Sequence, residues 1–284
     1  MLKKIFFAAA LLLASELIAK PVVIASIAPV EYLAKAVGGD KIEVQSLAKG
    51  DVHSYEPKPN DMKAVAKARI FIAAGLEFEE AWIPRFKASA KNLVVVKSDA
   101  KIAKLKEERG EQAEHDEKHE AHADPHVWLN PMLAITMARN ISDALIDMDK
   151  ANKDFYLENF QKLMNDLLAF DESAKNELAG LKNRKFVVYH PAWGYFAAHY
   201  DLEQISIERS GKEPKIDEMA STLKMIKDEN IKVIFADPNR SQKSAQVLAS
   251  QTGAKVELLD PLGYNLLENL KIAVGAIKDA NSPK

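Results

Sequence analysis

Three of the seven histidines in this chain come after predicted β-strands along the sequence and stand next to turn-forming residues. His53 lies in Gly-Asp-Val-His-Ser-Tyr-Glu-Pro, His126 in Asp-Pro-His-Val-Trp-Leu-Asn-Pro, and His190 in Val-Val-Tyr-His-Pro. An imidazole can ligate a metal ion, transfer a proton or form an ordinary hydrogen bond. A single loop histidine is most often only hydrogen-bonded, so a metal site requires that the fold bring the three together.

One carboxylate stands in a position similar to that of these histidines, after a predicted strand and beside a proline. Asp260, in Leu-Leu-Asp-Pro-Leu-Gly, comes at the end of the last β-branched run. Three imidazoles and one carboxylate can saturate a tetrahedral zinc ion. Manganese prefers more oxygen ligands and a larger coordination number, so His190 favours zinc and leaves copper, nickel and cobalt open. The alternative for Asp260 is an ordinary turn aspartate.

A second group of histidines precedes His126. His115, His119 and His122 stand among acidic residues in the run 111–124, which we expect to be a flexible polar loop. Such a loop can chelate a second, weaker metal ion without being preformed. The alternative is a solvated charged loop with incidental histidines.

Three further polar residues follow predicted strands. We expect Asp237, in Phe-Ala-Asp-Pro, to orient a ligand or shape a turn, and Glu208 and Arg209 to orient a ligand or pair with each other.

Short β-branched runs alternate with helical segments from Val22 onward, and the same order returns in the second half of the chain. This alternation predicts two similar α/β lobes with mainly parallel four-stranded sheets. The carboxyl ends of parallel strands form the ligand-binding edge of such sheets, where His53, His126, His190 and Asp260 can converge between the lobes. The predicted strands are Val22–Ser26, Ile42–Leu47, Ile70–Ala73, Leu93–Val96, Phe186–Tyr189, Gln204–Ile207, Val233–Ala236 and Val256–Leu259.

One long helix is predicted between the two halves. From Asn152 to Gly180 no proline or glycine interrupts the pattern, and apolar residues recur every three or four positions. At 1.5 Å per residue the helix is roughly 40 Å long and rigid. The expected division is an N-terminal lobe over 20–150, a linker helix over 151–180 and a C-terminal lobe over 181–284.

The chain begins with features of an export signal. Lys3 and Lys4 precede an apolar run that ends near Ala19, which predicts a cleavable signal peptide over residues 1–19. The chain has no cysteine, hence no disulfide and no lipid-anchored cysteine. We therefore expect a freely diffusing monomer in the periplasm of a Gram-negative cell, without direct membrane insertion. The net charge of −2 gives no reason to expect nucleic acid as a partner.

The chain resembles the periplasmic zinc-binding proteins of ABC-type high-affinity zinc importers. The shared segments are His53–Pro57, Asp124–Leu129, Tyr189–Trp193 and Leu259–Gly263, in the same order along the mature chain. The resemblance implies two α/β lobes on one long helix, with His53, His126, His190 and Asp260 as metal ligands in the interlobe cleft. One departure is Val52, where some zinc-binding members carry an acidic residue, and it places more weight on Asp260 or on water as the fourth ligand.

The expected function is non-catalytic: capture of zinc, as the transported ligand, and delivery to a membrane permease driven by a cytoplasmic ATPase. A carrier for manganese or for several divalent metals is the first alternative. A zinc hydrolase with Glu56 or Asp237 as base is the second, although the chain has no His-Glu-x-x-His segment. An adhesin or metal-scavenging protein is the third.

Overall fold

The computed structural model describes residues 20–106, 123–208 and 216–281, and within them it contains two parallel β-sheets and one long helix. The predicted signal peptide and the histidines of the acidic run lie outside these residues. In the described part of the chain, every helix is too short or too polar to span a bilayer.

The N-terminal lobe is built on a four-stranded sheet. Its central strands are fully apolar and buried because helices cover both faces, whereas the edge strands are partly exposed. The strands run parallel in the order β2-β1-β3-β4. They are β1 (Val22–Ala25), β2 (Glu43–Ser46), β3 (Ile70–Ala73) and β4 (Val94–Lys97).

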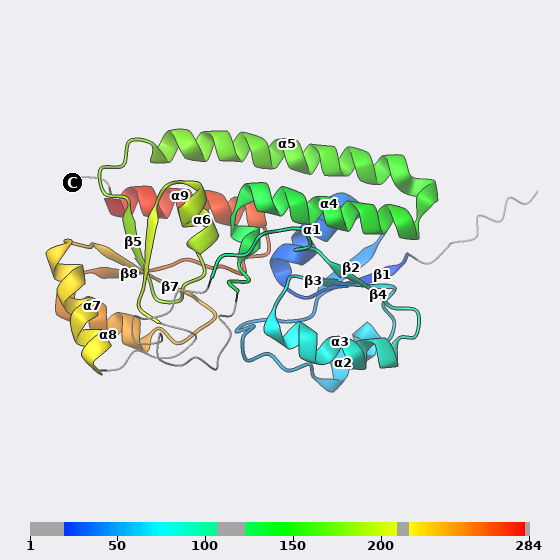
Figure 1. The fold of residues 1–284 in the computed structure, drawn as a ribbon, viewed down its shortest axis with the longest axis horizontal. Coiled ribbons are helices and arrows are strands. Elements are labelled where there is room, and N and C mark those ends of the chain that lie inside the picture. Colours follow the sequence, from blue (N-terminus) through cyan, green and yellow to red (C-terminus); the bar gives the residue numbers. More distant parts are fainter. Residues whose placement is uncertain (1–19, 107–122, 209–215, 282–284) are drawn as a thin grey trace, which may run out of the picture.

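Four helices belong to this sheet. α1 and α4 lie on the side that faces the long helix, and α2 and α3 lie on the opposite side (Figure 1). The bounds are α1 (Ala28–Gly38), α2 (Pro59–Val65), α3 (Glu77–Ser89) and α4 (Pro131–Met148), with a short 3₁₀ turn, η2 (Val127–Leu129), before α4.

The C-terminal lobe repeats the design. Its strands run parallel in the order β6-β5-β7-β8, which corresponds position by position to the first sheet. The strands are β5 (Lys185–Val188), β6 (Glu203–Ser206), β7 (Val233–Ala236) and β8 (Lys255–Leu258). The helices are α6 (Gly194–His199), α7 (Ile216–Asp228), α8 (Lys243–Thr252) and α9 (Leu266–Asn281).

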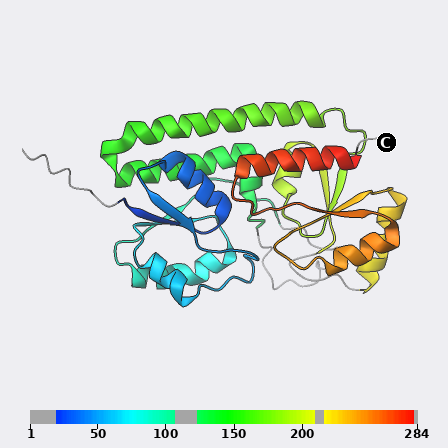
Figure 2. The same cartoon turned by 180° about the vertical axis from the view of Figure 1, so that it is seen from behind.

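The long helix α5 (Lys153–Leu178) follows a 3₁₀ turn, η3 (Lys150–Asn152), and runs along one side of the molecule above both lobes (Figure 1). It packs on α4 and α1 at one end and on α9 at the other, and the view from behind shows α9 directly beneath it (Figure 2). The buried stripe repeats every three or four residues, as the sequence predicted: Tyr156, Phe160, Leu163, Leu167, Phe170, Ala174 and Leu178. The two α/β lobes and the connecting helix are thus confirmed.

The hydrophobic core is continuous from one lobe to the other. One buried cluster includes the N-terminal sheet, the inner faces of α4, α5 and α9, and the residues after β5, while a second, smaller cluster lies under α7 and α8. The side chain of Trp128 is fully buried, and its Nε1 donates to the carbonyl of Pro261 in the other lobe at 2.8 Å. The lobes therefore meet through packed side chains beside the predicted ligand edge.

Candidate metal site

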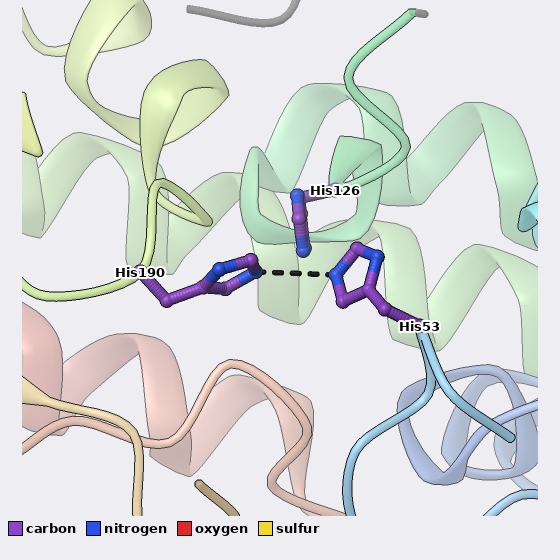
Figure 3. A group of neighbouring side chains, drawn as sticks. All are labelled: His53, His126 and His190. Atoms are coloured by element: carbon purple, nitrogen blue, oxygen red, sulfur yellow. Dashed lines mark hydrogen bonds between the residues drawn. The ribbon is translucent and has the colours of Figure 1, made fainter. Parts of the chain in front are cut away.

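The structure brings His53, His126 and His190 together between the lobes. One ring nitrogen from each lies within 4.8 Å of one ring nitrogen of each of the others. Figure 3 shows the three rings converging, with His126 directed at the space between the other two. The Nε2 atoms of His53 and His190 are 3.2 Å apart. Within the described residues this is the group of side chains whose spacing suits a metal ion.

His126 is held by its own loop. Asp124 Oδ1 accepts from the backbone N–H of His126 at 2.9 Å and lies 2.7 Å from its Nδ1. Both side chains are buried, so the carboxylate fixes the ring orientation and leaves Nε2 for a ligand. After His126, Asn130 caps α4 by accepting from the N–H groups of Met132 and Leu133.

His190 is held from two neighbouring strands. Val188 pairs with Ser206 in β6 and with Phe235 in β7, so two residues further along the chain His190 lies beside Glu208. Glu208 Oε2 is 3.0 Å from Nδ1 of His190, and both side chains are buried. The role expected for Glu208, orienting a ligand, agrees with this contact.

Arg240 is a site residue that the sequence did not reveal. It lies in the turn after β7, and its Nη1 is 2.6 Å from His190 Nδ1 and 3.0 Å from Glu208 Oε2. Burial, followed by the charges of His126, Arg240 and His53, lowers the pKa of His190 well below its ordinary value. The signal that could have found Arg240 is its place three residues after Asp237 at the ligand edge.

His53 stands on a more open loop. His53 as a whole residue is exposed, and Asp51 Oδ1 accepts from its backbone N–H at 3.2 Å. Burial of the ring, followed by the charges of His126 and Arg240, lowers the pKa of His53 to about 4. The ring is therefore neutral and ready to bind a metal ion near neutral pH. A hollow of about 430 Å³ opens beside it, and its lining includes Glu77 and Glu80.

Asp260 lies at the same strand edge but outside the three-histidine cluster. Its Oδ1 accepts from Asn239 Nδ2 at 2.8 Å and from the backbone N–H of Leu262 at 2.9 Å. Its assignment as the fourth ligand stays a prediction. Asp237 is bound to the same turn, because its Oδ1 accepts from the N–H and the side-chain amide of Asn239, and burial raises its pKa.

Val52 is buried in the hydrophobic core, so the position before His53 supplies packing. Arg209, His115, His119 and His122 lie outside the described residues.

The donor set suits zinc by its chemistry. Neutral imidazoles are borderline ligands that zinc binds readily, and two of the three rings have a carboxylate at Nδ1 that directs Nε2 inward. Manganese and magnesium favour carboxylate, carbonyl and water oxygens. Three nitrogens from two lobes therefore favour a late transition metal over a hard cation.

Comparison with known families gives one consistent result. The sequence profile of the family described as "Zinc-uptake complex component A periplasmic" matches residues 23–280. The chain is 30% identical over 279 residues to the high-affinity zinc uptake system protein ZnuA of Bacillus subtilis, covering 91% of this chain and 86% of that protein. A putative metal-binding protein of Treponema pallidum is 34% identical over 243 residues, covering 82% and 77%.

Solved structures agree with the sequence comparison. A crystal structure of ZnuA superposes with a TM-score of 0.87 at 35% identity, covering 93% of this chain and 100% of that one. The laminin-binding protein of Streptococcus agalactiae, described as bifunctional with adhesin and metal-transporting activity, gives a TM-score of 0.80 at 27% identity, covering 93% and 100%.

Proposed function

The chain belongs to the family of periplasmic zinc-uptake components, and from this premise we propose that His53, His126 and His190 hold the transported zinc ion. It is a zinc-binding, non-enzymatic solute-binding component of an ABC-type zinc uptake system. The hydrolase alternative is not retained, because the family is one of solute-binding proteins. Zinc is accordingly the cargo of the site.

A single observation carries the assignment of the site. The ring nitrogens of three histidines from two lobes lie within 4.8 Å of one another, a spacing that one metal ion can bridge. We propose Asp260 as the fourth ligand, because it follows β8 at the same sheet edge. Four protein ligands would leave no open position for an activated water, which suits a carrier.

We propose that the protein acts as a monomer in the periplasm of a Gram-negative cell, exported by a signal peptide over residues 1–19. It would deliver zinc to a membrane permease with a cytoplasmic ATPase. We propose that the chain consists of an N-terminal lobe over 20–150, a linker helix over 151–180 and a C-terminal lobe over 181–284.

We also propose that the acidic run 111–124 holds a second, weaker zinc ion through His115, His119 and His122.

The test is metal identity and stoichiometry. Residues 20–284 are purified from metal-free medium, offered an equimolar mixture of zinc, manganese, copper, nickel and cobalt, and analysed for bound metal. We expect one tightly bound zinc ion per chain, and a second, weaker ion that disappears when His115, His119 and His122 are replaced by Ala. Equal retention of zinc and manganese would instead favour a broad divalent-metal carrier.

The competing source of tight binding is the acidic run itself. The triple variant must therefore keep its tight zinc ion, while His126→Ala must bind zinc about 100-fold less tightly. Unchanged zinc affinity in His126→Ala would overturn the proposed site.

A further inference from the structure

Arg240 places a positive charge directly behind one of the proposed ligands. Its Nη1 is 2.6 Å from His190 Nδ1, on the side of the ring away from His53. Its side chain is 17% exposed, so solvent screens this charge only in part. A cation is an unexpected neighbour for a residue that binds a divalent cation, and its contacts show what it does.

A guanidinium group can only donate hydrogen bonds. The contact with His190 therefore needs a lone pair on Nδ1, which puts the ring proton of the neutral imidazole on Nε2. Nε2 is the atom that faces His53 Nε2 at 3.2 Å, and one of these two nitrogens must donate to the other. Arg240 thus favours the tautomer in which His190 presents an N–H to the cluster and cannot bind zinc through Nε2.

Glu208 favours the opposite tautomer. Its Oε2, 3.0 Å from the same Nδ1, accepts a hydrogen bond only if Nδ1 carries the proton. That arrangement frees the Nε2 lone pair for zinc, as a carboxylate behind a metal-binding histidine normally does. It also brings two N–H donors, from Arg240 and His190, to 2.6 Å from each other. Zinc can therefore bind Nε2 of His190 only if Arg240 moves away from Nδ1 while the contact between Nδ1 and Glu208 is kept.

The turn that carries Arg240 also contacts the other proposed C-terminal ligand. Asn239 Nδ2 donates to Asp260 Oδ1 at 2.8 Å, and the turn is closed by the N–H of Arg240, which donates to the carbonyl of Asp237 at 3.2 Å. Adjacent side chains of one turn thus donate to His190 and to Asp260. Movement of this turn would change the availability of both ligands together.

We propose that Arg240 is a release residue: its guanidinium competes for His190 Nδ1, lowers zinc affinity and speeds zinc dissociation. The proposal rests on the proposed function, in which His190 is a zinc ligand. It makes Arg240 a positioning residue that acts through His190. A carrier must surrender its ion, and a cation held within hydrogen-bond distance of a ligand supplies the opposing interaction.

The experiment compares Arg240→Met with Arg139→Met, a control at an exposed arginine on α4. Zinc affinity is measured by competition with a chelator of known affinity, and the dissociation rate by a chelator chase. We expect Arg240→Met to bind zinc about 10-fold more tightly and to release it more slowly, an effect typical in size of residues behind a ligand. Glu208→Gln is expected to change affinity in the opposite direction, and the control is expected to match the wild type.

A spectroscopic readout separates this role from a structural one. Long-range ¹H–¹⁵N correlation spectra of the zinc-free protein report the tautomer of each histidine ring, and Arg240→Met is expected to shift His190 from Nε2–H to Nδ1–H. Arg240→Gln, which removes the charge with a shorter side chain, serves as the second variant if Arg240→Met does not fold.

The outcomes that overturn the proposal are distinct. Unchanged or weaker zinc binding in a folded Arg240 variant would mean that Arg240 only holds Glu208 in place. Failure of the wild type to bind zinc would overturn the proposed function and this inference together, whereas tight binding by the wild type with no gain in the variant would overturn this inference alone.

Discussion

The two lobes share a strand order but hold their buried site histidines in different ways. In the N-terminal lobe, the carboxylate behind His126 comes from Asp124, two residues earlier in the same loop. In the C-terminal lobe, His190 is contacted by Glu208 and Arg240, which follow the two strands on either side of β5. One histidine is therefore fixed by local chain geometry, and the other by the packing of three strands.

This difference suggests a division of labour. A partner two residues away cannot move far from its ring, so His126 offers zinc one stable orientation. Partners 18 and 50 residues away can shift relative to His190 when their loops move. In the proposed site, the C-terminal lobe is then the side on which zinc affinity is adjusted.

Removal of either histidine is expected to have the largest effect. A binding free energy of roughly 10–16 kcal/mol shared among four ligands assigns about 3 kcal/mol to each, or about 100-fold in affinity. His126→Ala and His190→Ala should both show this loss in chelator competition. His199→Ala, whose ring contacts Asp171 on the long helix, is the control and should bind as the wild type. A loss in only one of the two variants would mean that one lobe alone binds the ion.

The carboxylates behind the rings are expected to matter next. Loss of the carboxylate behind a ligand histidine weakens metal binding by about 10- to 100-fold, which we expect for Asp124→Ala and Glu208→Gln. Combining each with Arg240→Met distinguishes the lobes. The Glu208 and Arg240 substitutions should be strongly non-additive, because both residues contact His190 Nδ1, whereas those of Asp124 and Arg240 should add to within about 0.5 kcal/mol. If the Asp124 and Arg240 substitutions were as non-additive as those of Glu208 and Arg240, the two lobes would not differ in how they hold their histidines.

The same contrast explains what could be predicted from the sequence. Local sequence indicates a rigid loop around His126, because Pro125 restricts Asp124 and because Asn130 and Pro131 favour the start of a helix. The contact of the Asp124 carboxylate with the ring was not predicted. The two lobes and the long helix were readable from periodicity. Arg240 was missed because its contact with His190 exists only once β5 and β7 are neighbours in register, a fact of tertiary structure that no local pattern contains.

A smaller effect is expected from pH. The pKa of His53 is lowered to about 4 in the folded protein, while an unfolded histidine titrates near ~6.5. Between these values the unfolded chain binds the additional proton, so stability should fall as pH drops from about 6.5 towards 4. Thermal unfolding of the zinc-free protein should show this slope, and His53→Gln should reduce it. A slope that is unchanged in His53→Gln would assign the effect to other groups, such as His190.

The smallest effect on zinc binding is expected from Tyr195→Phe, at the contact between the C-terminal lobe and the loop that holds His126. The hydroxyl of Tyr195, on α6, donates to the carbonyl of Asp124 and accepts from the N–H of Leu105, both at 2.8 Å. Tyr195→Phe removes two hydrogen bonds at a contact between the lobes and should cost about 1–3 kcal/mol of unfolding free energy. Tyr264→Phe, at a half-exposed ring, is the matched control.

Because Asp124 still holds His126 locally in Tyr195→Phe, zinc affinity should fall by less than about 10-fold, the lower limit for loss of a direct partner. Denaturant unfolding and chelator competition on the same preparation separate the two quantities. If zinc affinity fell as far as in Asp124→Ala, His126 would depend on the opposite lobe for its orientation. The conclusion that its own loop fixes the ring would then be wrong.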